Sequence, residues 1–303
     1  MKIYRTDQYP LWLPPGHRFP ARKYAVLYDA VSAFAAHLFE DAPLASDAEL
    51  AHVHTAAYIE AVTHGTLSKA EQQQIGLPWS PELPQRSRGS VGATLAACRS
   101  ALVSGCGASL AGGTHHAYAD HGSGFCVFND SAVALKVLLA EGVVRRAMVI
   151  DLDVHQGNGT AKLLADEPCL FTLSIHGAHN FPFTKEHSDL DIELEDGCQD
   201  EHYLDVLEST LPGLLGAHHP DLVIYLAGAD AYAGDRLGRL GLTKAGMAQR
   251  DHLVMDWCDR FGVPMAITMG GGYATPIEDT VAIHAATLAE AVRRYGHAHH
   301  IGD

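Results

Sequence analysis

The sequence predicts a single three-layer α/β/α domain whose central sheet is mostly parallel. Short apolar runs alternate with segments of helical periodicity through most of the 303 residues, which is typical of parallel strands joined by crossover helices. Hydrophobic residues make up 47% of the chain, enough for a large core. A proline-rich segment at 77–84 is the one plausible linker, but the residues before it show helical periodicity and no sheet signal. We therefore expect one domain over residues 1–303.

The expected elements alternate in order along the chain. Strands are predicted where short apolar runs stand between turn residues, at 108–110, 147–154, 170–175, 222–227 and 265–268. Helices are predicted where apolar residues recur every three or four positions, at 24–39, 48–62, 91–103, 131–139, 201–215, 244–260 and 277–294. The run 189–196 alternates acidic and apolar residues, as a half-exposed strand does. We expect a disordered end at the histidine-rich residues His297, His299 and His300.

Composition and charge exclude several classes of protein. The net charge is −15 and no basic patch stands out, which argues against nucleic acid as a partner. The acidic balance is compatible with a cationic substrate. No apolar stretch approaches the roughly 18 residues of a membrane span, and the first residues carry no signal segment, so we expect no membrane partner. Six scattered cysteines without a C-x-x-C pair indicate a reducing, cytoplasmic location.

The stretch 151–159 carries the strongest indication of a functional site. Asp151, Asp153 and His155 stand two residues apart, directly after the apolar run 147–150. Because side chains alternate faces along a strand, all three can project to the same side. Glycines then end the run, which places the polar groups at the carboxyl end of a strand. Ligands bind at that edge in open α/β folds.

Three further predicted strands also lead, through small residues, into polar side chains. These are the adjacent pair His115 and His116, then Asp230, and then Tyr273 after a Gly-Gly-Gly turn. The carboxyl ends of parallel strands lie along one edge of a sheet, so all four strand ends can converge. Two carboxylates and one imidazole leave a fourth metal position for water, as in catalytic zinc sites. A histidine base and a tyrosine donor beside such a site suit metal-assisted hydrolysis.

Five motifs stand in order along the chain: Gly-Gly-Thr-His-His-Ala at 112–117, Gly-Phe-Cys-Val-Phe-Asn-Asp at 124–130, Asp-Leu-Asp-Val-His-Gln-Gly-Asn-Gly at 151–159, Gly-Ala-Asp at 228–230 and Gly-Gly-Gly-Tyr at 270–273. These motifs, in this order, resemble the zinc-dependent histone deacetylase family. The sequence Pro-Gly-His-Arg-Phe-Pro, followed by Lys-Tyr, extends the resemblance toward the N-terminus. The sequence His-Gln-Gly-Asn-Gly at 155–159 is most similar to the class IV branch and its bacterial relatives. The resemblance implies the arginase/deacetylase α/β/α fold.

The resemblance implies two kinds of metal ion. A zinc ion (Zn2+) would be held by Asp153, His155 and Asp230, ligands that ferrous iron (Fe2+) in the cell also suits. A structural potassium ion (K+) would be held by Asp151, by the backbone of Asp153 and His155, and by Ser174.

The resemblance also implies a catalytic group. His116 would be the general base and then the acid that protonates the leaving amine, while His115 would be an electrostatic partner held by Asp151. Tyr273 would polarise the amide carbonyl and stabilise the oxyanion. Asn158 stands where many relatives have an aspartate that partners the second histidine. A neutral partner withholds negative charge, so we expect His116 to be less basic than in those relatives.

A narrow tunnel for an acyl-lysine side chain is a further implication of the resemblance. Phe125 and Phe181 would wall it, with Gly124 and Gly271 also touching the substrate. Phe183 meets the apolar requirement at the second wall as well as Phe181 does. A Gly-Gly-Thr precedes the histidine pair where many relatives have Pro-Gly, a departure expected to alter the rim of the site and not the metal ligands.

Several functions agree with these residues. The first is a metal-dependent amidohydrolase that removes acetyl or longer acyl groups from lysine in proteins or peptides, or from small acylated amines such as acetylpolyamines. A binuclear-metal ureohydrolase and a non-catalytic acyl-lysine binding module are the alternatives. The preferred acyl length depends on whether a pocket lies beyond the metal or is closed by Leu110 or Tyr118. The oligomeric state stays open.

Overall fold

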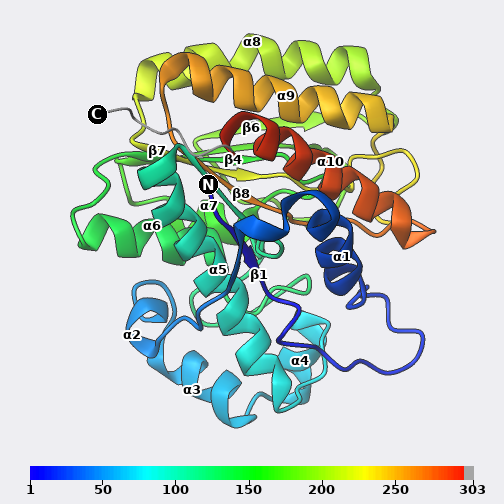
Figure 1. Ribbon diagram of the computed structural model, residues 1–303. Coiled ribbons are helices and arrows are strands. Elements are labelled where there is room, and N and C mark those ends of the chain that lie inside the picture. Colours follow the sequence, from blue (N-terminus) through cyan, green and yellow to red (C-terminus); the bar gives the residue numbers. More distant parts are fainter. Residues whose placement is uncertain (297–303) are drawn as a thin grey trace.

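The computed structural model describes residues 1–296, and the histidine-rich end at His297, His299 and His300 lies outside them. Its centre is an eight-stranded sheet in the order β2-β1-β3-β8-β7-β4-β5-β6. The sheet runs through the middle of the molecule in Figure 1. Every neighbouring pair of strands is parallel. The strands are β1 (Ile3–Arg5), β2 (Phe39–Asp41), β3 (Cys106–Ser109), β4 (Ala147–Asp151), β5 (Leu170–Gly177), β6 (Leu190–Leu194), β7 (Leu222–Leu226) and β8 (Met265–Thr268).

Helices cover both faces of the sheet, which confirms the predicted α/β/α layers (Figure 1). Alternate residues of a strand pack into two separate hydrophobic cores. On β4, Met148 and Ile150 pack in one core, and Ala147 and Val149 in the other. The first core joins the sheet to α1 (Lys23–Ala35), α8 (Asp200–His218), α9 (Lys244–Phe261) and α10 (Ile277–Tyr295). The second joins it to α5 (Glu82–Ser104), α6 (Asp130–Ala140), α7 (Asn158–Leu164) and the small helices α2 (Asp47–Leu50), α3 (Ala56–His64) and α4 (Lys69–Ile75).

The single helix predicted over 48–62 is wrong, because the chain breaks between α2 and α3. Ser46 caps α2 in a capping box, and the Thr55 side chain caps α3. The buried ring of His54 lies in the break. Its Nδ1 donates to the carbonyl of Tyr118 at 3.0 Å, and its Nε2 accepts the N–H of Asn129 at 3.0 Å. The break therefore lets one histidine tie this corner to the loops that follow β3.

The strand predicted over 147–154 is too long, because β4 ends at Asp151. The N–H of Leu152 still donates to Leu226 on β7, and the chain then bends. Asp153 and His155 are therefore presented by a turn and not by strand alternation. No helix in residues 1–296 has the length and apolar character needed to cross a bilayer.

Other differences concern short elements. β1 and β2 have three residues each, too few to show alternation, and α4 and α7 were also not predicted. The helix predicted over 91–103 begins earlier, at Glu82, inside the segment expected to be a loop. Pro84 lies in its first turn, where a missing backbone N–H removes no helical hydrogen bond.

Candidate active site

The carboxyl ends of four adjacent strands form the candidate site. The strands β3, β8, β7 and β4 are neighbours in the sheet order, so the chain segments that follow them emerge side by side. They border a cavity of about 760 Å³, and the convergence predicted from the sequence is present. The segments carry His115 and His116 after β3, Tyr273 after β8, Asp230 after β7, and Asp153 and His155 after β4.

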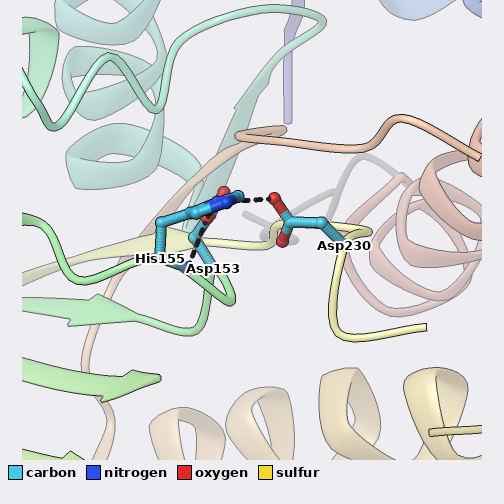
Figure 2. A group of neighbouring side chains, drawn as sticks. All are labelled: Asp153, His155 and Asp230. Carbon is cyan, nitrogen blue, oxygen red and sulfur yellow. Dashed lines mark hydrogen bonds and ion pairs between the residues drawn. The ribbon is translucent and has the colours of Figure 1, made fainter. Parts of the chain in front are cut away.

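Asp153, His155 and Asp230 lie together, and Asp153 and His155 line the cavity. Figure 2 shows the imidazole of His155 between the two carboxylates. Its Nδ1 lies 2.9 Å from Asp153 Oδ1 and 3.2 Å from Asp230 Oδ2. One ligand atom from each of the three residues falls within 4.8 Å of the others, and all three side chains are buried.

The environment of these three residues fits a divalent cation. Asp230 Oδ1 accepts the N–H of Val154 at 2.9 Å, whereas the buried Oδ2 accepts no hydrogen bond within residues 1–296. Burial and the neighbouring Asp153 carboxylate raise the pKa of Asp230 to about 6. Two buried carboxylates this close need a compensating positive charge. One imidazole and two carboxylates form a ligand set that suits zinc or ferrous iron.

The two histidines after β3 have different partners. His115 Nδ1 lies 2.6 Å from Asp151 Oδ2, and His116 Nδ1 lies 2.6 Å from Asn158 Oδ1. Burial opposes a charge on His115, but the carboxylates of Asp151 and Asp153 outweigh it and raise the pKa of His115 to about 9. Burial and the nearby imidazolium charges hold the pKa of His116 well below its usual range. These shifts favour the charged form of His115 and the neutral form of His116.

The position of the proton on His116 follows from the other contacts of Asn158. Asn158 Nδ2 donates to the hydroxyl of Tyr118 at 3.0 Å, so its Oδ1 faces His116. An amide oxygen only accepts, so Nδ1 of His116 carries the proton and Nε2 keeps the lone pair. The Tyr118 hydroxyl in turn lies 3.3 Å from Glu186 Oε1. Tyr118 thus supports Asn158 from outside the cavity, and neither Tyr118 nor Leu110 lines it.

Tyr273 lines the cavity and is held through its backbone. Its N–H donates to Asp235 Oδ2 at 2.6 Å, and its carbonyl accepts from Arg236 Nε at 2.9 Å. Burial and the carboxylates of the metal group raise the pKa of Tyr273 well above its usual value. The phenol therefore stays protonated and able to donate. Asp235 and Arg236 were not predicted as site residues, because they have no recognisable spacing to Tyr273 in the sequence.

The four predicted substrate residues all line the cavity. The Phe181 ring packs edge-on against His116, with centroids 4.9 Å apart, whereas Phe183 is 85% exposed. Gly124 has φ of +54°, and a Cβ there would lie 2.5 Å from Cδ2 of His116. The N–H of Gly271 donates to Asp153 Oδ2 at 2.7 Å. Gly124 and Gly271 therefore allow the loops to close onto the histidine and the carboxylate.

The residues expected to hold potassium also lie together. Ser174 on β5 stands in register with Asp151 on β4, and its Oγ lies 2.8 Å from Nδ1 of His176. Within residues 1–296, no N–H or O–H donates to the backbone carbonyls of Asp153 or His155. Carboxylate and carbonyl oxygens are the ligands that hard cations prefer. These residues fit a potassium ion.

Two buried groups that support the site were not assigned from the sequence. Asp130 accepts the N–H groups of Gly113 and Thr114, at 3.0 and 2.7 Å, and so fixes the loop before the histidine pair. Asp130 lies in the 124–130 motif, which was the available signal. Arg250 on α9 is fully buried and donates to the Gly228 carbonyl at 2.6 Å. Nothing in the sequence distinguishes Arg250 from the exposed arginines that helices usually carry.

Comparison with known proteins agrees with the site. The family model described as the histone deacetylase domain matches residues 17–289. An uncharacterised protein of Picosynechococcus sp. is 41% identical over 292 residues, covering 93% of this chain and 95% of that protein. Histone deacetylase 2 of Arabidopsis thaliana is 33% identical over 189 residues, covering 61% of this chain and 49% of that protein.

A solved structure shows the same fold. The HDA15 HD domain superimposes with a TM-score of 0.81 at 21% sequence identity, covering 98% of this chain and 92% of that domain. None of these three relatives is named as a class IV enzyme, so that branch stays a prediction. The family model spans most of the chain, and the chain belongs to the histone deacetylase family.

Proposed function

We propose that this protein is a metal-dependent amidohydrolase that removes acyl groups from lysine side chains. The observation that carries the proposal is that a metal-binding group, a base and a hydrogen-bond donor lie together at one cavity. A buried Asp-His-Asp group fits a divalent cation. A neutral histidine has its Nε2 free to act as a base. A protonated tyrosine stands beside them. A binding module would need no such combination of base and donor.

The residues divide the work of amide hydrolysis between them. A divalent cation on Asp153, His155 and Asp230 would polarise the amide carbonyl and acidify a water molecule. His116 Nε2 takes the proton of the attacking water, whose oxygen bonds to the acyl carbon. The Tyr273 hydroxyl donates to the carbonyl oxygen as that oxygen gains negative charge.

The same base completes the reaction. The C–N bond breaks when the proton held on His116 Nε2 moves to the leaving amine nitrogen, giving a carboxylic acid and a free amine. Asn158 accepts from Nδ1 throughout and keeps the ring oriented. The carboxylate of Asp151 favours the charged form of His115, which would contribute positive charge beside the developing oxyanion.

We also propose that acyl chains longer than acetyl fit the cavity. The cavity is also lined by the buried apolar side chains of Leu11, Leu77 and Leu83. Each methylene buried there contributes about 0.8 kcal/mol. Gly112 and Gly113 also line the cavity, but they do not enlarge it. A Cβ at either one would lie within 2.6 Å of neighbouring atoms, so these glycines serve close packing and do not open space.

The experiment that tests this function compares substrates with purified, zinc-loaded protein. Acetyl-lysine in an uncharged peptide should release acetate and free lysine amine in equal amounts. Acetylpolyamines and guanidino compounds serve as the substrates of the competing functions. Peptide binding without turnover would contradict the proposal in favour of a binding module. Turnover confined to acetylpolyamines would contradict the assignment of lysine as the substrate.

A further inference from the structure

The charge of the cavity is opposite to that of the whole protein. The chain carries a net charge of −15, yet the side chains that line the cavity include four lysines and arginines and a single carboxylate. That carboxylate is Asp153, which belongs to the proposed metal group. Of the four cations, Lys23 and Arg86 are buried, whereas Arg18 and Arg239 are exposed. No acidic side chain faces the two exposed arginines from the lining.

Arg18 is held beside one aromatic wall of the cavity. In the residue before it, His17, Nε2 donates to the Gly76 carbonyl at 3.1 Å. In the residue after it, Phe19, the N–H donates to His17 Nδ1 at 3.1 Å, and the ring packs against Phe125 with centroids 5.4 Å apart. Arg18 itself makes no ion pair or hydrogen bond with any residue in 1–296. Its backbone is therefore held on both sides, and its charged side chain is available to a ligand.

Arg239 is held beside the loop that carries the other wall. Its N–H donates to Asn180 Oδ1 at 3.2 Å, and Asn180 Nδ2 donates to the Leu237 carbonyl at 2.7 Å. The guanidinium lies 3.2 Å from Asp196, which is 45% exposed and does not line the cavity. Asp196 occupies only part of the five-donor fork of an arginine. Asn180 directly precedes Phe181, so Arg239 is fixed next to that wall.

Together these contacts place two cationic forks at the entrance of a tunnel for an acylated amine. We propose, on the basis of the function above, that Arg18 and Arg239 select acyl-lysine substrates that carry a carboxylate close to the acylated side chain. The carboxylate is either an acidic residue flanking the lysine in a peptide or the α-carboxylate of a free acylated lysine. Acylated polyamines carry ammonium groups instead and are disfavoured.

The overall negative charge does not oppose this selection at short range. At physiological ionic strength, exposed charges farther apart than about 8 Å are largely screened. A substrate carboxylate at the entrance therefore responds to the arginines beside it more than to acids elsewhere on the surface. An arginine can also form two parallel, charge-assisted hydrogen bonds with one carboxylate of the substrate. A substrate whose acylated lysine is flanked by lysines cannot form these bonds.

The first arm of the test varies the substrate. Three peptides carry one acetyl-lysine flanked by aspartate, serine or lysine, and kcat/KM is measured for each at low and high salt. We expect aspartate to exceed lysine by roughly tenfold at low salt, mainly through KM, with the ratio shrinking as salt screens the charges. Free Nα-formyl, Nε-acetyl-lysine is compared with its α-carboxamide, which separates an α-carboxylate from an acidic flank as the preferred source.

The second arm varies the protein. Arg18→Gln and Arg239→Gln should each reduce the aspartate-to-lysine ratio by roughly two- to fivefold, the range expected of an exposed ion pair. Arg22→Gln is the matched control, because Arg22 is exposed, pairs with Glu278 and does not line the cavity. Equal or reversed preference, or a ratio unchanged in both variants, overturns the selection by arginine. Failure to hydrolyse even the serine-flanked peptide overturns the proposed function itself.

Discussion

Asn158 Oδ1 lies 2.6 Å from Nδ1 of His116, so the proposed general base is oriented by an uncharged partner. The pKa of His116 lies well below its usual range, chiefly because the ring is buried. An Asn158→Asp change would place a negative charge at this contact and raise that pKa. The base works when deprotonated, so the acidic limb of the kcat/KM profile should move to higher pH.

A pH profile of both proteins on one acetyl-lysine peptide measures this shift. Tyr118→Phe is the control, because it removes the other partner of Asn158 without adding a charge. Its acidic limb should move less than that of Asn158→Asp. An unmoved limb in Asn158→Asp, or a shift to lower pH, would show that the contact does not govern the titration of His116.

The chemical step should depend on His116 and Tyr273. Loss of a general base lowers kcat by roughly 10²–10⁴-fold, and loss of one oxyanion donor by roughly 10²–10³-fold. His116→Ala and Tyr273→Phe should show these losses in kcat while each protein keeps its metal. Steady-state kinetics with elemental analysis of the same samples checks both points. Full kcat in Tyr273→Phe on an unactivated amide would refute the oxyanion role.

Gly124 should not tolerate a side chain, because a Cβ there would lie 2.5 Å from the His116 ring. Gly124→Ala is therefore expected to displace the base and lower kcat by roughly 10²-fold, the cost of misplacing a catalytic group by about 1 Å. Gly213→Ala is the matched control, since a Cβ at that position of α8 meets nothing within 4 Å. Equal kcat in the two variants would mean that Gly124 does not position His116.

Acyl length tests the proposed depth of the cavity. We expect kcat/KM to rise from acetyl- to octanoyl-lysine in one peptide, because each methylene can bury apolar surface against Leu11, Leu77 and Leu83. Myristoyl-lysine extends the series. A steady fall with chain length would show that the cavity does not admit an acyl chain longer than acetyl.

The sequence predicted the centre of the site better than its surroundings. His115, Asp153, Asp230 and Tyr273 each follow a strand, and strand ends can be recognised from local patterns. The contact of His116 with Asn158, 42 residues later, was expected from the family resemblance and is present. The supporting groups could not be recognised, because burial alone gives Arg250 or Asp235 a role, and burial is a property of the folded chain.

The fold shows the same division between local and long-range information. Long periodic segments such as α9 and α10 were placed to within one residue at each end. The helix break at His54 was not predicted, because it depends on backbone groups of Tyr118 and Asn129 far along the chain. The net charge suggested a cationic substrate, but a net charge does not indicate which charged side chains line the cavity. Arg18 and Arg239 both line it, although they are far apart in the sequence.

The most direct test of the central claim is the metal content of the Asp230→Ala protein, measured together with its deacylase activity. After zinc loading and dialysis, the unchanged protein should hold one zinc ion per chain and release acetate from acetyl-lysine peptide. Glu208→Ala, which removes an exposed carboxylate on α8, should match it. Asp230→Ala should lose both the zinc and the activity. Retention of one zinc per chain in Asp230→Ala, or full turnover by unchanged protein freed of metal, would contradict the account.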